Sequence, residues 1–279
     1  MIKSVIVAVD STDSSKQAQS FALDLAKECG ASVTGIAVLD TPWIKRPMAM
    51  PIGGGSYRSH RDETLIADQA KELDTKIKEF CAYCDTKGIE CRWIEIEGSP
   101  AEKLDHEAEQ HDLVIIGRET NFHGVRGHDV GDATEQLLED HPRPMIVVPP
   151  GGSKGGNDIV VSFDGSLPSS RAMHMLYLLG LTNGRKVHVV SVDPDHDAAV
   201  ALTNRGCAFF KDRGIDAIAH PWQESHDIAH AILDLVDSLD TGLLAMGAFG
   251  EHGLLHNLLS GSVTKQLLRA CPVPLFVHY

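Results

Sequence analysis

The residues with the clearest chemical potential are glycines and hydroxyl-bearing residues in the segment 246–264, MGAFGEHGLLHNLLSGSVT. This segment follows an apolar run and precedes a predicted helix around VTKQLLRA. Its early glycines allow the backbone to approach a ligand closely, and the residues at the helix start offer unpaired N–H groups to a phosphate. The hydroxyl groups add further donors. The candidate phosphate-binding residues are Gly247, Gly250, Gly261, Ser262, Val263 and Thr264.

A carboxylate is expected beside this segment. Asp164 ends the apolar run IVVSFD, and from there it could accept hydrogen bonds from a ribose or from the amino group of adenine. The chain has no P-loop pattern and no G-x-G-x-x-G fingerprint. Nothing near residues 247–264 looks like an obligate general base for ATP hydrolysis. A simpler interpretation of the glycines, turn formation after a strand, stays open.

Composition and charge restrict the classes of partner. The chain has 279 residues, enough for two ordinary domains or one large one. Apolar residues make up 43% and charged residues 23%, as is typical of a globular protein. A formal net charge of −14 disfavours binding to nucleic acid or to an anionic membrane surface. The opening run MIKSVIVAVD is too short for a signal-peptide core or a membrane span. We therefore expect a cytoplasmic protein.

An internal repeat organises the chain. SVIVAVDSTDSS near the start matches DIVVSFDGSLPSS in the second half, which places Asp10 opposite Asp164. A pair of glycines at the same spacing closes each half, Gly117 with Gly131 and Gly247 with Gly261. Between the halves, the Pro- and Gly-rich run PPGGSKGGND has the composition of a flexible joint. We therefore predict domains over residues 1–150 and 156–279. Extra residues of the first half, near 41–62, are predicted to form a long loop.

Each half follows the pattern β-α-β-α-β-α-β-α-β. Strands are predicted near 4–9, 32–39, 89–96, 112–117 and 144–148, and near 158–163, 186–192, 215–221, 242–247 and 273–278. Runs such as LVIIG and MIVV are wholly apolar, as in a strand covered by helices on both faces. We predict an α/β fold of two tandem, doubly wound, five-stranded parallel sheets. In such sheets, ligands bind at the carboxyl ends of the strands where the winding direction reverses.

Cysteines and histidines are weaker candidates for a site. The six cysteines are scattered among helix and strand patterns, so we expect reduced thiols. Cys81 and Cys84 have redox spacing but lie late in a predicted helix, where a thiolate is not stabilised. His226 and His230 lie four residues apart on a predicted helix, and with Asp227 or His220 they could bind zinc. Solvated histidines are the commoner explanation.

The second half resembles the universal stress protein family. That family has an ATP-binding signature of glycine, two residues, glycine, nine residues, glycine, then Ser or Thr. The glycines quoted above and Ser262 follow this order, but ten residues separate Gly250 from Gly261. The resemblance covers the whole chain, once per half, and implies an adenine nucleotide alpha hydrolase-like fold that binds ATP, with any Mg²⁺ arriving on the nucleotide. It also implies that Asp164, Val192 and Met246 line the site.

The first half departs further from the signature. Gly117 is followed by Arg118, Glu119 and Thr120, so the second glycine is missing. Asp132 stands where the family has Ser or Thr, and a carboxylate beside a phosphate weakens binding through like-charge repulsion. We therefore predict a degenerate first site that binds no nucleotide, or a different ligand.

The ends of the two halves suggest how they associate. Each half ends in a short apolar strand, and an open apolar edge invites pairing. Single-domain members of the resembled family commonly dimerise through this strand. We expect Met145–Val148 to pack near Leu275–Val277 in an intramolecular pseudo-dimer, and a homodimer of whole chains also stays open.

Our leading hypothesis is a cytoplasmic protein that binds ATP or another adenine nucleotide in stress response or signalling, without strong catalysis. The alternatives are an interaction protein of the same fold that binds no nucleotide, and a slow ATPase.

Overall fold

The computed structural model describes residues 1–47, 55–123, 130–138, 143–153, 155–224, 226–248 and 263–279. The strands of the first half are β1 (Ser4–Ala8), β2 (Ser32–Leu39), β3 (Arg92–Glu97), β4 (Leu113–Gly117) and β5 (Met145–Val148). Those of the second half are β6 (Asp158–Ser162), β7 (Val187–Asp193), β8 (Ala217–Gln223), β9 (Thr241–Gly247) and β10 (Leu275–His278). All ten strands lie where the apolar runs predict them.

Helices connect the strands as the alternating pattern requires. The first half contains α1 (Asp13–Cys29), α2 (Thr41–Ile44), α3 (Gly55–Lys87), α4 (Pro100–Ala108) and α5 (Asp132–Leu137). The second half contains α6 (Leu167–Leu178), α7 (His196–Lys211), α8 (Ile228–Ser238) and α9 (Val263–Ala270).

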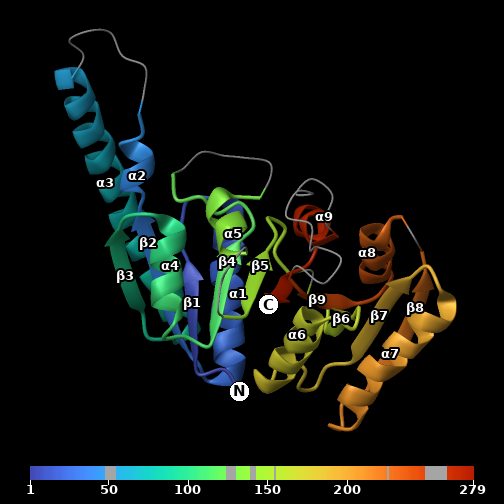
Figure 1. The fold of residues 1–279 in the computed structure, drawn as a ribbon. Helices are drawn as coiled ribbons and strands as arrows, with labels where there is room; N and C mark the ends of the chain where they lie inside the picture. Colours follow the sequence, from blue (N-terminus) through green and yellow to red (C-terminus); the bar gives the residue numbers. More distant parts are fainter. Residues whose placement is uncertain (48–54, 124–129, 139–142, 154, 225, 249–262) are drawn as a thin grey trace.

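The strands form one sheet of ten, in the order β3-β2-β1-β4-β5-β10-β9-β6-β7-β8 (Figure 1). Pairing is parallel within each half, which confirms the predicted α/β fold. The two halves meet where β5 and β10 pair antiparallel, with Ile146 opposite Phe276. The expected contact between these two strands is therefore confirmed. The two predicted sheets are joined into one, because each last strand uses its free backbone groups on the other.

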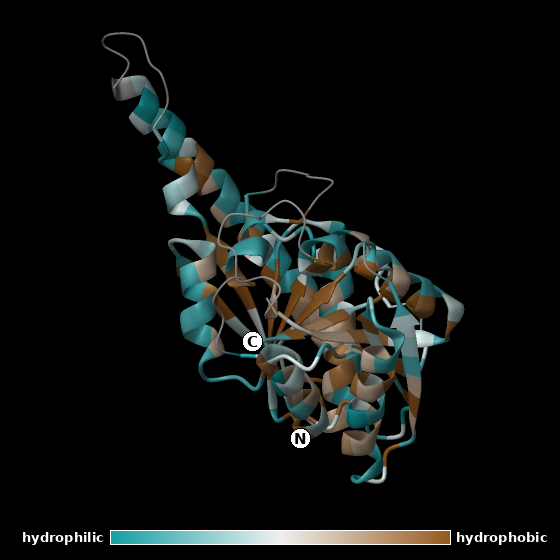
Figure 2. Cartoon of the chain, turned by 45° about the vertical axis from the view of Figure 1, so that its right-hand side comes forward, coloured by the Kyte–Doolittle hydropathy of each residue, from teal (hydrophilic) through white to brown (hydrophobic). Residues whose placement is uncertain are grey.

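Each face of the sheet is covered by helices from both halves (Figure 1). Buried side chains of α1, α3, α6 and α7 form one core with the strands, and those of α4, α5, α8 and α9 form the other. The strands are strongly apolar through the middle of the molecule, whereas the helices contain both hydrophilic and hydrophobic residues (Figure 2). Both cores therefore run across the junction between the halves.

The extra segment of the first half is partly helical. Asp40 accepts a hydrogen bond from the N–H of Trp43 at 2.9 Å and so begins α2, while Arg61 donates to the carbonyl of Ile44 at 2.8 Å and closes it. The long α3 begins at Gly55 and extends beyond the sheet beside α2 (Figure 1). The prediction of a loop over 41–62 is therefore wrong for these helical stretches, because a cap and an arginine from α3 stabilise the turn. Residues 48–54 lie outside the described part of the chain.

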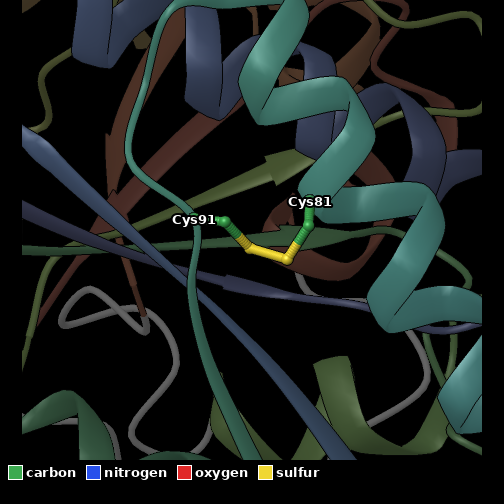
Figure 3. Close-up of a disulfide and its surroundings, with 2 residues drawn as sticks. All are labelled: Cys81 and Cys91. Carbon is green, nitrogen blue, oxygen red and sulfur yellow. A yellow bond between two sulfur atoms is a disulfide. The ribbon is translucent and has the colours of Figure 1, made fainter.

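The prediction of six reduced thiols is wrong for one pair. Cys81, late in α3, forms a disulfide with Cys91, just before β3 (Figure 3). The chain turns back after α3, so the two Cα atoms lie 5.1 Å apart, within the range that a disulfide requires. The other four cysteines form no disulfide, and Cys84 is buried in the core. Cys81 and Cys84 therefore do not act as a redox pair here.

Charged side chains also connect the halves. Arg118, which follows β4, donates through Nη1 to the carbonyls of Leu268 at 3.3 Å and Cys271 at 3.1 Å, at the C-terminal end of α9. Lys265 of α9 lies 3.0 Å from a carboxylate oxygen of Glu135 in α5. Because a helix C-terminus attracts cations, Arg118 stabilises the junction as well as the helix.

Replacing Arg118 with Met should lower the free energy of unfolding by about 2 kcal/mol, since two charge-assisted hydrogen bonds across the junction are lost. Arg143→Met is the matched control, because Arg143 donates to the Glu109 carbonyl within the first half and is exposed. Urea denaturation measures both variants. Equal, negligible effects would show that Arg118 adds nothing to the junction.

The disulfide gives a second expectation. Peptide mapping without reduction should recover Cys81 linked to Cys91, with the other four cysteines alkylated. Cys91→Ser should lower the free energy of unfolding by about 2–3 kcal/mol, because the closed loop no longer restricts the unfolded chain. Cys29→Ser, at a free thiol, is the control. Recovery of Cys81 and Cys91 as free thiols from unreduced protein would contradict the pairing.

Candidate functional site

The strand order reverses at two equivalent places, between β1 and β4 and between β6 and β9. In a doubly wound sheet, the carboxyl ends of the strands diverge at such a point and leave room for a ligand. Asp10 and Gly117 lie at the first reversal, and Asp164 and Gly247 at the second. The repeat found in the sequence therefore places one candidate site in each half.

In the second half, Asp164 follows β6 and is exposed. Its Oδ1 accepts a hydrogen bond from the N–H of Ser166 at 3.0 Å. Partial burial of the carboxyl group would raise its pKa, but hydrogen bonds from the side chains of Ser166 and Ser169 and from the Ser166 backbone outweigh this effect. The pKa of Asp164 is consequently below its ordinary value. The start of α6 thus holds an ionised acceptor at the sheet edge.

Ser166 and Ser169 lower the pKa of this carboxylate, and they were not among the site residues predicted from the sequence. The Ser166 side chain caps α6 by accepting from the N–H of Ser169 at 3.2 Å. The run SLPSSR has the signature of a helix start, with a hydroxyl residue followed by proline at the beginning of the helix. That signal could have identified both residues as partners of Asp164.

Gly247 ends β9 against the start of α6. A Cβ atom added to Gly247 would overlap with the backbone of Pro168 and Ser169. In the first half, a Cβ on Gly117 would lie only 2.5 Å from backbone atoms of Ser14 and Ser15 in α1. Both glycines are therefore required for helix-to-strand packing, whether or not a ligand is bound.

The structure locates four further predicted site residues. Val192 is half-buried near the end of β7, Met246 is buried in the core, Val263 begins α9, and Thr264 is buried. Thr134, the counterpart of Thr264 in the first half, donates its hydroxyl to the carbonyl of Gly117 at 3.0 Å. A threonine at this position can thus stabilise the end of the strand by a hydrogen bond within the protein. The remaining candidates, Gly250, Gly261 and Ser262, lie outside the described residues.

The first half has a different arrangement around its carboxylate. Asp10 is buried, with 7% of its surface exposed. Its Oδ1 accepts from the N–H of Thr12 at 2.9 Å, and its Oδ2 accepts from the N–H groups of Asn121 at 2.9 Å and Phe122 at 3.3 Å. The chain itself therefore occupies both oxygens of Asp10, whereas Asp164 is exposed.

The histidines are not arranged as the alternative of a zinc site would require. His226 precedes α8, and Asp227 caps that helix by accepting from the N–H of His230 at 3.1 Å, so the histidines do not share a helical face. His220 instead lies with its Nε2 2.8 Å from Nδ1 of His188, whose Nε2 is 3.1 Å from Asp158. Burial and then the charge of the neighbouring imidazole lower the pKa of His220. Among the described residues, no group of three or more His, Cys, Asp or Glu side chains is placed to hold a metal.

Comparison with known proteins agrees with this geometry. The family model described as the Universal stress protein family matches residues 1–149 and 213–278. Over 98% of both chains, the sequence is 23% identical to a universal stress protein of Synechocystis. It is 26% identical to one of Methanocaldococcus jannaschii over 53% of this chain and 82% of that protein. The crystal structure of a universal stress protein from Archaeoglobus fulgidus has a similar fold, with a TM-score of 0.71, 17% identity, and coverage of 99% of this chain and 97% of the other.

The packing of Gly247 leads to a stability prediction. Gly247→Ala should lower the free energy of unfolding by about 1–3 kcal/mol, because the new methyl group overlaps with the backbone at the start of α6. Gly151→Ala is the control, since Gly151 has open space around it, and should change stability by less than about 0.5 kcal/mol. Thermal denaturation without ligand measures both. An unchanged melting temperature for Gly247→Ala would leave the glycine free for a purely ligand-related role.

Proposed function

The chain belongs to the universal stress protein family, and on this premise we propose that its second domain binds one ATP or another adenine nucleotide. The domains extend over residues 1–150 and 156–279 in this proposal. The nucleotide lies at the strand reversal between β6 and β9. Asp164 accepts hydrogen bonds from its sugar or base, and the N-terminus of α9 receives its phosphates.

The observation that carries the proposal is the contrast between two equivalent carboxylates. Asp10 is buried and has both oxygens engaged by its own chain, whereas Asp164 is exposed and ionised at the same point of the fold. An acceptor held ionised by serine hydrogen bonds and left accessible is suited to hydroxyl or amino donors of a ligand. Val192 and Met246 supply neighbouring apolar contacts in this proposal.

Phosphate binding is assigned to the opening of α9. The first N–H groups of a helix have no partner within the helix, and the helix dipole is positive at this end. The signature residues Gly250, Gly261 and Ser262 precede the described start of α9 at Val263, and with Val263 and Thr264 they complete the phosphate-binding set. Mg²⁺ accompanies the nucleotide rather than occupying a protein site. This local donor group attracts a phosphate despite the overall net charge of −14.

A second candidate function, an interaction protein that binds no nucleotide, is favoured by the packing of Gly247. Since Gly117 has the same packing role in the half whose signature is incomplete, a first signature glycine can be retained for the fold alone. Copurified nucleotide, identified by mass spectrometry, separates this candidate from the proposed function. Turnover above that of a Gly250 variant would indicate a slow ATPase.

A cytoplasmic stress-response or signalling role belongs to the same proposal. Among the helices that the structure describes, none is both long and apolar enough to cross a membrane. The Cys81–Cys91 disulfide is of a kind rarely kept in the cytosol, so the expectation of a cytoplasmic protein no longer has support from its cysteines.

Isothermal titration of the full chain with ATP tests the proposal. We expect about one site per chain, and affinity at least about tenfold weaker for Ser262→Asp, because the added carboxylate repels the phosphates. The affinity for adenosine, which has no phosphates, should fall much less in Ser262→Asp. Ser153→Asp is the matched control: Ser153 is exposed in the linker, and Asp can still accept the hydrogen bond from Gly155.

The same titration checks Asp164. Because its pKa is lowered, the carboxylate stays ionised between about pH 5 and 8, and its contribution to affinity should be constant there and lost only as the pH falls through that lowered pKa. Asp164→Asn should weaken binding throughout this range. Two equivalent sites, or full affinity in Ser262→Asp, would reject the proposed arrangement.

A further inference from the structure

A chain of hydrogen bonds crosses the three outermost strands of the second half. Oδ2 of Asp158 in β6 lies 3.1 Å from Nε2 of His188 in β7, and Nδ1 of His188 lies 2.8 Å from Nε2 of His220 in β8. His188 is buried, with 4% of its surface exposed, and His220 is half-buried. Because a carboxylate only accepts hydrogen bonds, Nε2 of His188 carries a proton towards Asp158. The contact between the two imidazoles then holds one proton, which either ring can donate.

The fold itself does not require these ionisable side chains. The strand registers, together with the repeat that matches Asp10 to Asp164, give each of the three residues a counterpart in the first half. Asp158, His188 and His220 stand where the first half has Ser4, Thr34 and Ile94. Burying an imidazole costs free energy of folding that an isoleucine does not. The set in the second half therefore needs an explanation beyond packing.

The last member of the set lies on an edge strand. β8 ends the sheet, so β7 is its one neighbouring strand, and Pro221 has no N–H group to donate. Helix α7 packs on one face of β8. On the other face the side chains follow in the order Ile218, His220 and Trp222, and Ile218 and Trp222 are 38% and 36% exposed. The contact between His220 and His188 therefore ties the exposed face of β8 to the interior of the sheet.

Asp158 and the two imidazoles are the charged groups that face one another in this part of the described structure. Helix α8 packs over the same face of β7, and its buried residues are all apolar. The charged residues that lie on α8 or directly precede the neighbouring strands are exposed to solvent, which screens them: Lys186, Asp216, His230, Asp234, Asp237 and Asp240.

We propose that Asp158, His188 and His220 form an acid-responsive latch, which holds β8 against β7 near neutral pH and releases it in acid. The closed latch has room for one added proton but not for two. When both imidazoles are fully protonated, two N–H groups and two positive charges oppose each other across the 2.8 Å contact, and the hydrogen bond is lost. β8 then separates without breaking any other strand pair. This inference does not depend on nucleotide binding in the second domain.

The pH range follows from His220. Burial of the ring, and then the charge of His188, lowers the pKa of His220 in the folded protein. A histidine in an opened strand titrates at about pH 6.5. The opened state therefore binds more protons than the closed state. The latch contributes its full stability above about pH 6.5, and this contribution is lost progressively as the pH falls below that value.

Hydrogen–deuterium exchange of the full chain at about pH 7.5 and about pH 5.5 tests the latch. After correction for the intrinsic pH dependence of exchange, the protection of Ala217–Gln223 should fall about fivefold or more in acid, because the opened state takes up one more proton. Arg92–Glu97, the edge strand of the first half, is the internal comparison and should not show this fall.

Variants at His220 decide whether the histidine pair is responsible. His220→Gln keeps a group that can donate to or accept from His188 but does not titrate, and His220→Ile copies Ile94 and needs no hydrogen bond. Both should abolish the fall. His230→Gln is the matched control, because His230 is exposed on α8, and it should keep the fall.

Three results would overturn the proposal. The first is constant protection of β8 in the wild type at the two pH values. The second is a fall that persists in either His220 variant. The third is an equal fall in Arg92–Glu97, which would indicate general unfolding in acid.

Discussion

The antiparallel pairing of β5 with β10 is the interaction on which the rest of the structure depends. Each strand is the last of its half, and each is apolar and buried, so neither could remain a solvent-exposed edge. Their pairing joins two parallel sheets into one and makes both cores continuous across the junction. It also brings Arg118 to the end of α9 and Glu135 to Lys265, so charged contacts reinforce the same junction.

Within this frame, two equivalent carboxylates have acquired opposite environments. Asp10 and Asp164 occupy matching positions, yet the chain after β4 folds over Asp10, whereas Asp164 is exposed beside the serines of α6. Duplication of a fold therefore does not duplicate its chemistry. A carboxylate can bind a ligand only through oxygens that the chain's own donors leave accessible. For Asp10, the donors to Oδ2 are the N–H groups of Asn121 and Phe122, which lie in the segment after β4 and not in a repeated strand.

The first signature glycine shows how one residue type serves two purposes. Gly117 and Gly247 both lie against the first helix of their half, where a side chain would collide with backbone. A glycine at this position follows from the packing of strand against helix in each half, so its presence carries little information about ligands. The informative residues are the neighbours in the sequence, such as Asp132 where the repeat has Ser262, because a carboxylate repels a phosphate.

The amino-acid sequence by itself determined the α/β pattern, the positions of the ten strands and the repeat, because apolar runs and turn residues act locally. The pairing of the two last strands was expected from their open apolar edges and from the family resemblance. It also identified Asp164 and Gly247 as residues at the strand ends. Only the tertiary structure decided that Cys81 meets Cys91, that α2 and α3 occupy much of the supposed loop, that His226 lies off its helix, and that Asn121 and Phe122 cover Asp10. Each of these depends on contacts between distant residues, or on a cap that sets where a helix begins, and spacing along the chain does not record either.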